Sequence, residues 1–389
     1  MENRHVALLI ETSREYGRGL LRGIIKYQND HGFWSVYFKP HGLGDPPPSW
    51  LRTWRGDGIL ARINDRRMAK AVLQTEIPTV DLRGAVGDLG LPMIGMDNYE
   101  VVRLAAEHFL ERGFRHFAFC GTPRGENRNQ DMRADEYERL LAERGLDCAT
   151  YFKPSRGRAP IAWEDEQEQM ARWLERLPKP IAVMTCHDDR GLQVLDACHR
   201  VGLAVPDQVA ILGIDNDPFL CNLSNPSLSS IDVNPERIGY EAAAVLDRLM
   251  QGDTPLPGPC FFSPRGVVTR GSTDVTAVGD PELARAISLI RSRACTPTSI
   301  GRLLREVTMS RTSLFRGFKK YLGRSPKEEM TWVRMERAKE LLRTTNVPVS
   351  EVAGRVGYAE AKYFVEVFHR SEGLTPLCYR RKVKADDRS

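Results

Sequence analysis

The sequence predicts an α/β region built from two lobes, each a doubly wound parallel sheet, followed by an all-α domain with two helix-turn-helix units. Three observations support this prediction. Apolar runs alternate with segments of helical periodicity from residue 5 to about residue 230. The segment GDTPLPGP loses this periodicity, and VTAVGDP is typical of a short linker. A helical pattern is then repeated in the rest of the chain. With 389 residues the chain is too long for one ordinary domain. We therefore expect the α/β region at residues 1–274, a linker at 275–280, the helical domain at 281–383 and a tail at 384–389.

The α/β region contains short apolar runs that are typical of buried parallel strands. They are HVALLI, DGILA, IPTV, HFAFC, IAVM and VAILGI, and segments with helical spacing separate them. Because roughly ten strands are indicated, two lobes fit better than one sheet. We expect the chain to cross to the second lobe near residues 96–100 and to return near residues 227–234, before a helix at 235–250.

The C-terminal region contains a duplicated helical pattern. The apolar face of the first helix recurs after 49 residues: Ile300, Leu303, Leu304 and Val307 return as Val349, Val352, Ala353 and Val356. The second helix, with the Gly and Pro that end it, recurs after 50 residues: Leu314, Phe318, Gly323 and Pro326 return as Phe364, Phe368, Gly373 and Pro376. Each copy has the helix, turn and helix layout that places a second helix in a DNA major groove. A linking helix is expected at residues 326–344.

The distribution of charge favours DNA as the partner of the helical domain. Residues 280–389 hold 23 Lys and Arg against 13 Asp and Glu, whereas residues 1–279 hold 33 against 38. A compact basic domain joined to a mildly acidic region is typical of a nucleic-acid binder fused to another module.

The helical domain closely resembles the AraC family of transcription regulators over residues 283–382. The matching segments are MSRTSLFRGFKKYLGRSP, RAKELL and VSEVAGRVGYAEAKYFVEVFHRSEGLTPLCYRR. The resemblance implies a first recognition helix at residues 310–321, with Thr312, Phe315 and Arg316 facing the groove. Arg316 can pair with guanine O6 and N7, and Phe315 can contact a thymine methyl group. The flanking cations, Arg311, Lys319 and Lys320, are expected to contact phosphates.

The second recognition helix departs from the family pattern. Its groove-facing positions are Ala361, Lys362, Val365 and Glu366. Glu366 stands where a basic residue is usual, and its carboxylate can either accept a hydrogen bond from cytosine N4 or pair with a neighbouring Lys or Arg. We expect the two units to contribute unequally to base recognition.

Polar residues follow several strand ends in the α/β region, where side chains converge on a ligand. Carboxylates, amides and arginines suit a molecule with many hydroxyl groups. The candidate sugar-binding residues are Glu11, Ser13, Tyr16, Asp81, Arg133, Asp188, Asp215 and Asn216; the same loops also hold Arg83, Asp97, Asn98 and His187.

The segments DGIL, MDN, GLAVPDQVAILGIDND and NPSLSSIDVNPERIGYEAA resemble the effector-binding domains of the LacI family and the periplasmic sugar-binding proteins. The LacI family's own N-terminal DNA-binding helices are missing, because the first strand begins at His5. By this resemblance Asp215 and Arg133 align with residues that bind the sugar in that family.

A LacI-like sensor joined to an AraC-type domain resembles the regulators of xylose operons. The resemblance implies D-xylose as the inducer, activation of xylose-catabolic genes, operator DNA and RNA polymerase as partners, and a homodimer. A repressor, or a regulator that responds to another sugar, remains the alternative. The N-terminus lacks a recognisable export signal, so a cytoplasmic location is expected.

Other functional classes fit the sequence less well. The run GRGLLRG is similar to a dinucleotide-binding loop, but its spacing is one residue too long and Lys39 stands where an acid should bind ribose. No hydrolase signature occurs, and the eight cysteines form no C-x-x-C pair. The neighbours at 186–189 point apart, which disfavours a metal site, and a sugar-transport protein would need no basic domain. We expect neither an enzyme nor a cofactor.

Overall fold

The computed structural model describes residues 4–42, 44–152, 162–254, 258–274, 280–296, 300–303 and 305–386. The chain divides into two compact units, one of residues 1–110 and 115–274 and the other of residues 275–389 with 111–114. The predicted linker, apart from Asp280, lies outside the described residues, as do Leu304 of the first apolar helix face and the last three residues of the tail.

The first lobe of the α/β unit is built on a four-stranded parallel sheet. Its strand order is β2(Ser35–Phe38), β1(His5–Leu9), β3(Gly58–Ala61) and β4(Thr79–Asp81). Helices α1(Glu15–His31), α2(Arg66–Leu73) and α8(Pro235–Met250) belong to this lobe, as does the parallel pair β5(Ile94–Met96) and β11(Cys260–Phe262). Strands β1 and β3 and helix α2 enclose an apolar core.

The second lobe contains a six-stranded sheet. Its order is β12(Gly266–Val268), β10(Ser229–Asp232), β9(Val209–Ile214), β8(Ile181–Thr185), β6(Phe117–Gly121) and β7(Cys148–Phe152), with β12 antiparallel at the edge. Its helices are α3(Asn98–Glu111), α4(Arg128–Ala142), α5(Trp163–Arg176), α6(Asp188–Arg200) and α7(Pro218–Leu223). Strands β6, β8 and β9 are buried along their whole length, so they form continuous apolar runs rather than alternating ones.

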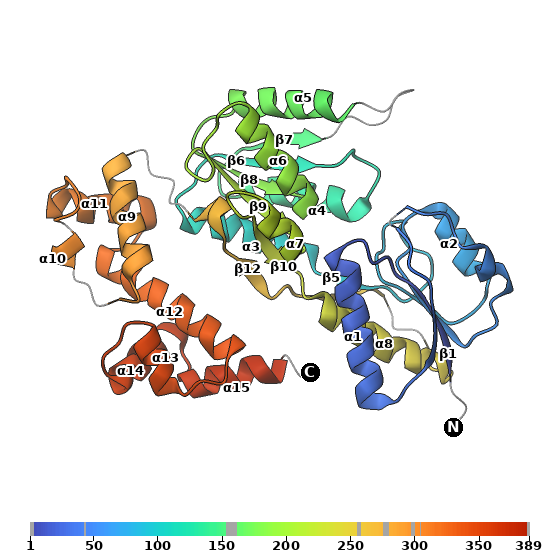
Figure 1. The fold of residues 1–389 in the computed structure, drawn as a ribbon. Coiled ribbons are helices and arrows are strands. Elements are labelled where there is room, and N and C mark those ends of the chain that lie inside the picture. Colours follow the sequence, from blue (N-terminus) through green and yellow to red (C-terminus); the bar gives the residue numbers. More distant parts are fainter. Residues whose placement is uncertain are drawn as a thin grey trace. The chain divides into compact units, whose positions relative to one another are not determined.

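The chain passes between the lobes three times (Figure 1). The predicted crossings lie at β5–α3 and β10–α8. The third, between β11 and β12, was not predicted, because the short strand Cys260–Phe262 follows a Pro- and Gly-rich stretch that hides its periodicity.

The glycine-rich run of the first helix allows two helices to approach closely. Helices α1 and α8 pack side by side (Figure 1). A Cβ on Gly23 would lie 1.9 Å from the backbone oxygen of Glu236, and one on Gly239 would lie 2.1 Å from that of Leu20. The run GRGLLRG therefore serves helix packing, which accounts for its departure from a phosphate-binding loop.

The helical unit is a duplicated arrangement around one shared helix. Its elements are α9(Pro281–Arg293), α10(Ile300–Leu303), α11(Arg311–Leu322), α12(Pro326–Thr344), α13(Val349–Arg355), α14(Ala361–Glu372) and α15(Pro376–Asp386). Met330 of α12 joins the core around α9 and α11, and Met335 and Leu342 join the core around α13 and α14. Helices α11 and α14 both end at a glycine with a φ of 72°, which confirms the repeated stop at Gly323 and Gly373.

Within the described residues, no helix is both long and apolar enough to cross a membrane.

Candidate functional site

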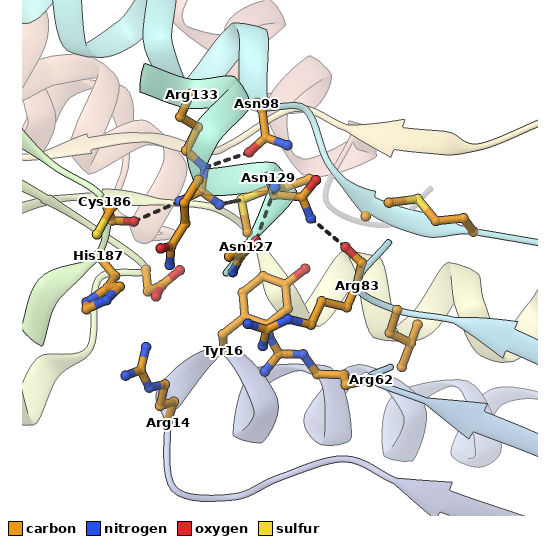
Figure 2. Close-up of a pocket in the computed structure, with 16 residues that line it drawn as sticks. Arg14, Tyr16, Arg62, Arg83, Asn98, Asn127, Asn129, Arg133, Cys186 and His187 are labelled. Atoms are coloured by element: carbon orange, nitrogen blue, oxygen red, sulfur yellow. Dashed lines mark hydrogen bonds between the residues drawn. The ribbon is translucent and has the colours of Figure 1, made fainter. Parts of the chain in front are cut away.

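A compact cavity lies between the two lobes of the α/β unit (Figure 2). Its volume is about 60 Å³, measured as the space open to the centre of a water molecule. A small space with a mostly polar wall suits a small polar molecule. The lining residues are Arg14, Tyr16, Arg62, Leu82, Arg83, Met93, Gly95, Met96, Asn98, Asn127, Asn129, Gln130, Arg133, Cys186, His187 and Asp215.

Arg133 is held in place by neutral groups. Its Nε donates to Asn98 Oδ1 at 2.6 Å, its Nη1 to the Cys186 backbone oxygen at 2.8 Å, and its Nη2 to Met96 Sδ at 3.0 Å (Figure 2). Burial lowers the pKa of this guanidinium, and the nearby carboxylate of Asp215 counteracts part of that effect. The guanidinium is thus fixed at the cavity wall by three hydrogen bonds.

Asp215 supplies the one carboxylate among the cavity-lining residues. It follows β9 with a φ of 104°, and no donor binds its side chain within the described part of the chain. Burial raises the pKa of this carboxyl, while Arg133 and other nearby cations oppose the rise. An open acceptor beside a fixed guanidinium can accept from one ligand hydroxyl while the guanidinium donates to another.

Asp188 does not line the cavity. It stabilises the loop that carries Asp215 through hydrogen bonds to its neighbours. Its Oδ1 accepts from Ser230 Oγ at 2.6 Å and its Oδ2 from the Asp217 backbone N–H at 2.8 Å. Burial, together with the charge of Asp215, raises its pKa to about 8. Gly213 makes room for this carboxyl, since a Cβ there would lie 2.1 Å from Asp188 Oδ1.

Four other predicted sugar-binding residues are also placed away from the cavity. Glu11 is buried in an ion pair with Arg62. Asp81 accepts from the backbone N–H groups of Arg83 and Gly84, at 2.9 and 3.1 Å. Asn216 accepts from Arg270 Nη2 at 2.7 Å, and Ser13 is exposed.

Of the eight candidate sugar-binding residues, the structure therefore brings Tyr16, Arg133 and Asp215 together. It adds Arg83, Asn98 and His187 from the same predicted loops, whereas Asp97 instead accepts from the backbone N–H of Tyr99 at the start of α3.

Sequence reasoning missed several cavity residues. Arg62 directly follows the strand segment GILA, so the strand-end rule that selected Asp81 applied to it as well. Asn129 and Gln130 precede Arg133 by one helical turn and share its face of α4, which is a readable signal. The thioether residues Met93 and Met96 carried no signal that distinguishes a cavity wall from a core.

Polar contacts join the lobes around the cavity. Arg14 pairs with Asp189 at 3.2 Å, and Arg18 pairs with Asp217 at 3.0 Å. Asn129 Nδ2 donates to the Arg83 backbone oxygen at 2.5 Å (Figure 2). These contacts hold the lobes together around a small space.

The neighbours Cys186 to Asp189 have four different environments. Cys186 is buried, His187 Nδ1 accepts from the Arg190 N–H at the start of α6, Asp188 faces Ser230, and Asp189 faces Arg14. The expected divergence is only partial, because His187 Nδ1 also lies 3.3 Å from Asp189 Oδ2, while Asp188 points away to Ser230.

The helical unit exposes most of the predicted DNA-contacting residues. Arg311, Thr312, Arg316, Lys319 and Lys320 are exposed on α11, and Phe315 is partly buried, with the Arg311 guanidinium 5.6 Å from its ring.

Helix α14 differs from α11. Ala361 and Val365 pack against the core around α13 and α14, so of the four predicted groove-facing positions only Lys362 and Glu366 are exposed, and Tyr363 is exposed beside them. Tyr363 is 51% exposed and was not predicted. Glu366 makes no ion pair within the described residues, so the alternative of a neighbouring salt bridge is not what the structure has.

Comparisons with known proteins agree with this two-unit organisation. A family model for a periplasmic binding protein-like domain matches residues 106–273, and one for a helix-turn-helix domain matches residues 303–382. The xylose operon regulatory protein of Escherichia coli (strain K12) is 28% identical over 97% of each chain. That of Haemophilus influenzae (strain ATCC 51907 / DSM 11121 / KW20 / Rd) is 29% identical over 96% of this chain and 97% of the relative.

A solved structure, described as that of the xylose-binding transcription activator xylR, covers 98% of both chains at 27% identity with a TM-score of 0.65. The chain is a transcription regulator. The predicted fold class and the prediction that this regulator is not an enzyme are confirmed. Its α/β unit is the effector-binding part, and its helical unit carries an AraC-type DNA-binding domain.

Proposed function

We propose that D-xylose binds in the cavity between the lobes and thereby controls how helices α11 and α14 engage operator DNA. The observation that carries this proposal is the placement of Asp215 beside the fixed guanidinium of Arg133 in a small polar cavity. The choice of D-xylose follows from the names of the relatives that match over nearly the whole chain, which are xylose operon regulatory proteins. Asp215 accepts from a sugar hydroxyl, and Arg133 and the amides of Asn98 and Asn129 donate to or accept from others.

The mechanism is a shift between open and closed lobes. A sugar that contacts both lobes favours the closed state, and the ion pairs Arg14–Asp189 and Arg18–Asp217 add to that preference. Closure then changes the DNA affinity of the helical unit. The size of the change is set by the difference in DNA-binding free energy between the open and the closed state. By resemblance the regulator is an activator of xylose-catabolic genes that acts as a cytoplasmic homodimer and contacts RNA polymerase.

Replacing Asp215 with alanine tests the site. We expect calorimetry on the full-length protein to detect D-xylose binding to the wild type and about a hundredfold weaker binding to Asp215→Ala, because a buried donor is left unpaired. Operator affinity without sugar should stay within about threefold, since the substitution lies in the other unit.

The matched control is Asp207→Ala, an exposed carboxylate outside the cavity. Equal D-xylose binding by wild type and Asp215→Ala would contradict the site. A thermal-shift panel of pentoses and hexoses identifies the sugar, and a shift with another sugar only would overturn D-xylose. Transcription in vitro with and without the sugar decides between activation and repression.

A further inference from the structure

One part of the cavity lining is apolar, although most of the lining is polar. The second lobe contributes amide and guanidinium groups, those of Asn98, Asn127, Asn129 and Arg133 (Figure 2). The first lobe contributes, beside its own polar groups, three side chains that have no hydrogen-bond donor, those of Leu82, Met93 and Met96. We call these three side chains the apolar wall.

The apolar wall is continuous because its residues stand at the ends of two adjacent strands. Leu82 directly follows β4, Met93 directly precedes β5, and Met96 is the last residue of β5. The backbones of Asp81 and Met93 form a parallel bridge, and the Asp81 N–H donates to the Pro92 backbone oxygen at 2.8 Å. The wall therefore belongs to one edge of the first lobe.

The fold makes room for the side chain of Met93. A Cβ on Gly84 would lie 2.4 Å from Met93 Cε, and one on Gly95 would lie 3.2 Å from the same atom. Gly84 also has a φ of 61°, which favours glycine. The Met93 backbone oxygen accepts from the Cys260 N–H at 2.8 Å. The methyl end of Met93 thus packs against two glycines at the cavity wall.

The apolar wall offers little to a ligand hydroxyl. Met96 Sδ already accepts from Arg133 Nη2 at 3.0 Å, and the thioether of Met93 is a weak acceptor. The guanidinium of Arg83, which follows Leu82 in the chain, lies beside the ring of Tyr16 (Figure 2). A hydroxyl group that faces the wall would lose its hydrogen bonds to water without replacing them, and this loss lowers affinity.

A pentose in its pyranose form has one ring carbon that suits such a wall. The first four carbons of D-xylopyranose carry hydroxyl groups, whereas the fifth is a methylene group. D-glucopyranose differs from it only by a hydroxymethyl group on that carbon. Against the apolar wall this hydroxymethyl group would need extra space and would bury an unpaired hydroxyl.

We propose that the apolar wall receives the methylene edge of a pentopyranose, and that Met93 makes the cavity select a pentose over the corresponding hexose. This inference rests on the proposed function, because it places the same neutral sugar in the same cavity. Polar side chains, among them Arg133 and Asp215, hold the sugar hydroxyls, and the apolar wall disfavours a sugar with a hydroxymethyl group on the fifth carbon.

Calorimetry on the full-length protein tests this selection with D-xylose, 6-deoxy-D-glucose and D-glucose. We expect the wild type to bind D-xylose about a hundredfold more tightly than D-glucose. The affinity for 6-deoxy-D-glucose should lie between the two, because its extra methyl group needs space but buries no hydroxyl.

Substitutions at Met93 test the wall directly. Met93→Gln keeps the length of the side chain and adds an amide that can pair with the extra hydroxyl, so D-glucose should bind about tenfold more tightly than to the wild type. Met93→Ala frees space, so 6-deoxy-D-glucose should gain about tenfold. Met93→Leu keeps the wall apolar and should retain the wild-type preference. Met132→Gln makes the polar change at an exposed methionine outside the cavity and should alter no sugar affinity.

Equal affinity of the wild type for D-glucose and D-xylose would overturn the selection and leave the proposed function intact. The same conclusion would follow if the preference falls in Met93→Gln and Met93→Ala only because D-xylose binds more weakly, with no gain for the larger sugars. A wild-type protein that binds operator DNA but not D-xylose would instead overturn the proposed function.

Discussion

Arg316 and Lys319 occupy the same exposed helix but face different parts of a DNA duplex in the proposed complex. Both are exposed on α11, and Arg316 makes no ion pair within the described residues. Arg316→Ala should weaken operator binding by about 1 to 3 kcal/mol and relax specificity at one base pair. Lys319→Ala should weaken operator and random DNA equally and reduce the salt slope by about one. An equal loss on both DNAs for Arg316→Ala, in a fluorescence titration, would make Arg316 a phosphate contact.

Asp188 gives the α/β unit a pH dependence whose sign follows from its environment. Burial raises its pKa to about 8 in the folded protein, whereas the unfolded chain ionises it at about pH 4. Between these pH values the carboxyl is ionised in the unfolded chain but protonated in the folded protein. Each rise in pH therefore stabilises the unfolded state relative to the folded state, and the free energy of unfolding falls as the pH rises.

An uncharged amide at this position tests that dependence. In the variant Asp188→Asn the new side chain can still accept from the Asp217 N–H and donate to Ser230 Oγ, but it does not titrate. Thermal unfolding should therefore show Asp188→Asn gaining stability relative to wild type as the pH rises from about 5 to about 8. A stability difference that stays constant over this range would contradict a protonated Asp188.

The same residue illustrates what the sequence can predict about a site. The rule that ligands meet the ends of parallel strands selected Tyr16, Arg133 and Asp215, which the structure brings together at one cavity. It did not distinguish Asp215 from Asp188, because both follow strand ends and differ only in the direction of the side chain. That direction depends on Gly213 and on the φ of 104° at Asp215, which are tertiary features.

At the scale of elements, the close contact between α1 and α8 depends on glycines, which have no side chain. A Cβ on Gly23 would lie 1.9 Å from the backbone oxygen of Glu236 and 2.7 Å from the backbone N of Tyr240. Because backbone cannot move aside locally, Gly23→Ala should destabilise the α/β unit by about 1 to 3 kcal/mol. Gly354→Ala is the control, since no atom lies within 4 Å of its Cβ position in α13, and it should stabilise the helical unit by about 0.5 to 1 kcal/mol. Denaturant unfolding measures both, and a neutral Gly23→Ala would show that the helices can separate without cost.

Most helices and buried strands were predictable because their signals are local. Helix α12 has a Ser325 and Glu328 capping box with Pro326 at its first position, and it begins and ends at the predicted residues. The edge strands β7 and β11 were not predicted. Both are short and half buried, so neither shows the continuous apolar run of a central strand.

At the scale of the whole molecule, the proposed mechanism makes the DNA response depend on the population of closed lobes. Arg18 of α1 pairs with Asp217 of the second lobe at 3.0 Å, and the Glu15 backbone N–H donates to the same oxygen at 3.2 Å. Neither residue lines the cavity, so the contact affects ligand binding through closure alone. Because this ion pair is partly exposed, it stabilises the closed state only slightly. Removing it lowers the population of the closed state by a small factor, and the apparent sugar affinity falls by the same factor.

Arg18→Gln should therefore weaken effector binding about three- to tenfold, and the difference from wild type should shrink at high salt. The operator response should need more sugar but reach the same maximum, because the saturated closed state is unchanged. Arg139→Gln removes an exposed arginine whose ion pairs, with Glu136 and Glu143, involve only the C-terminal end of α4, so its sugar affinity should match wild type. Calorimetry paired with sugar-dependent DNA titration distinguishes the outcomes. A lower maximum response with unchanged sugar affinity would mean that Arg18 acts on the transmission to the DNA-binding domain and not on lobe closure.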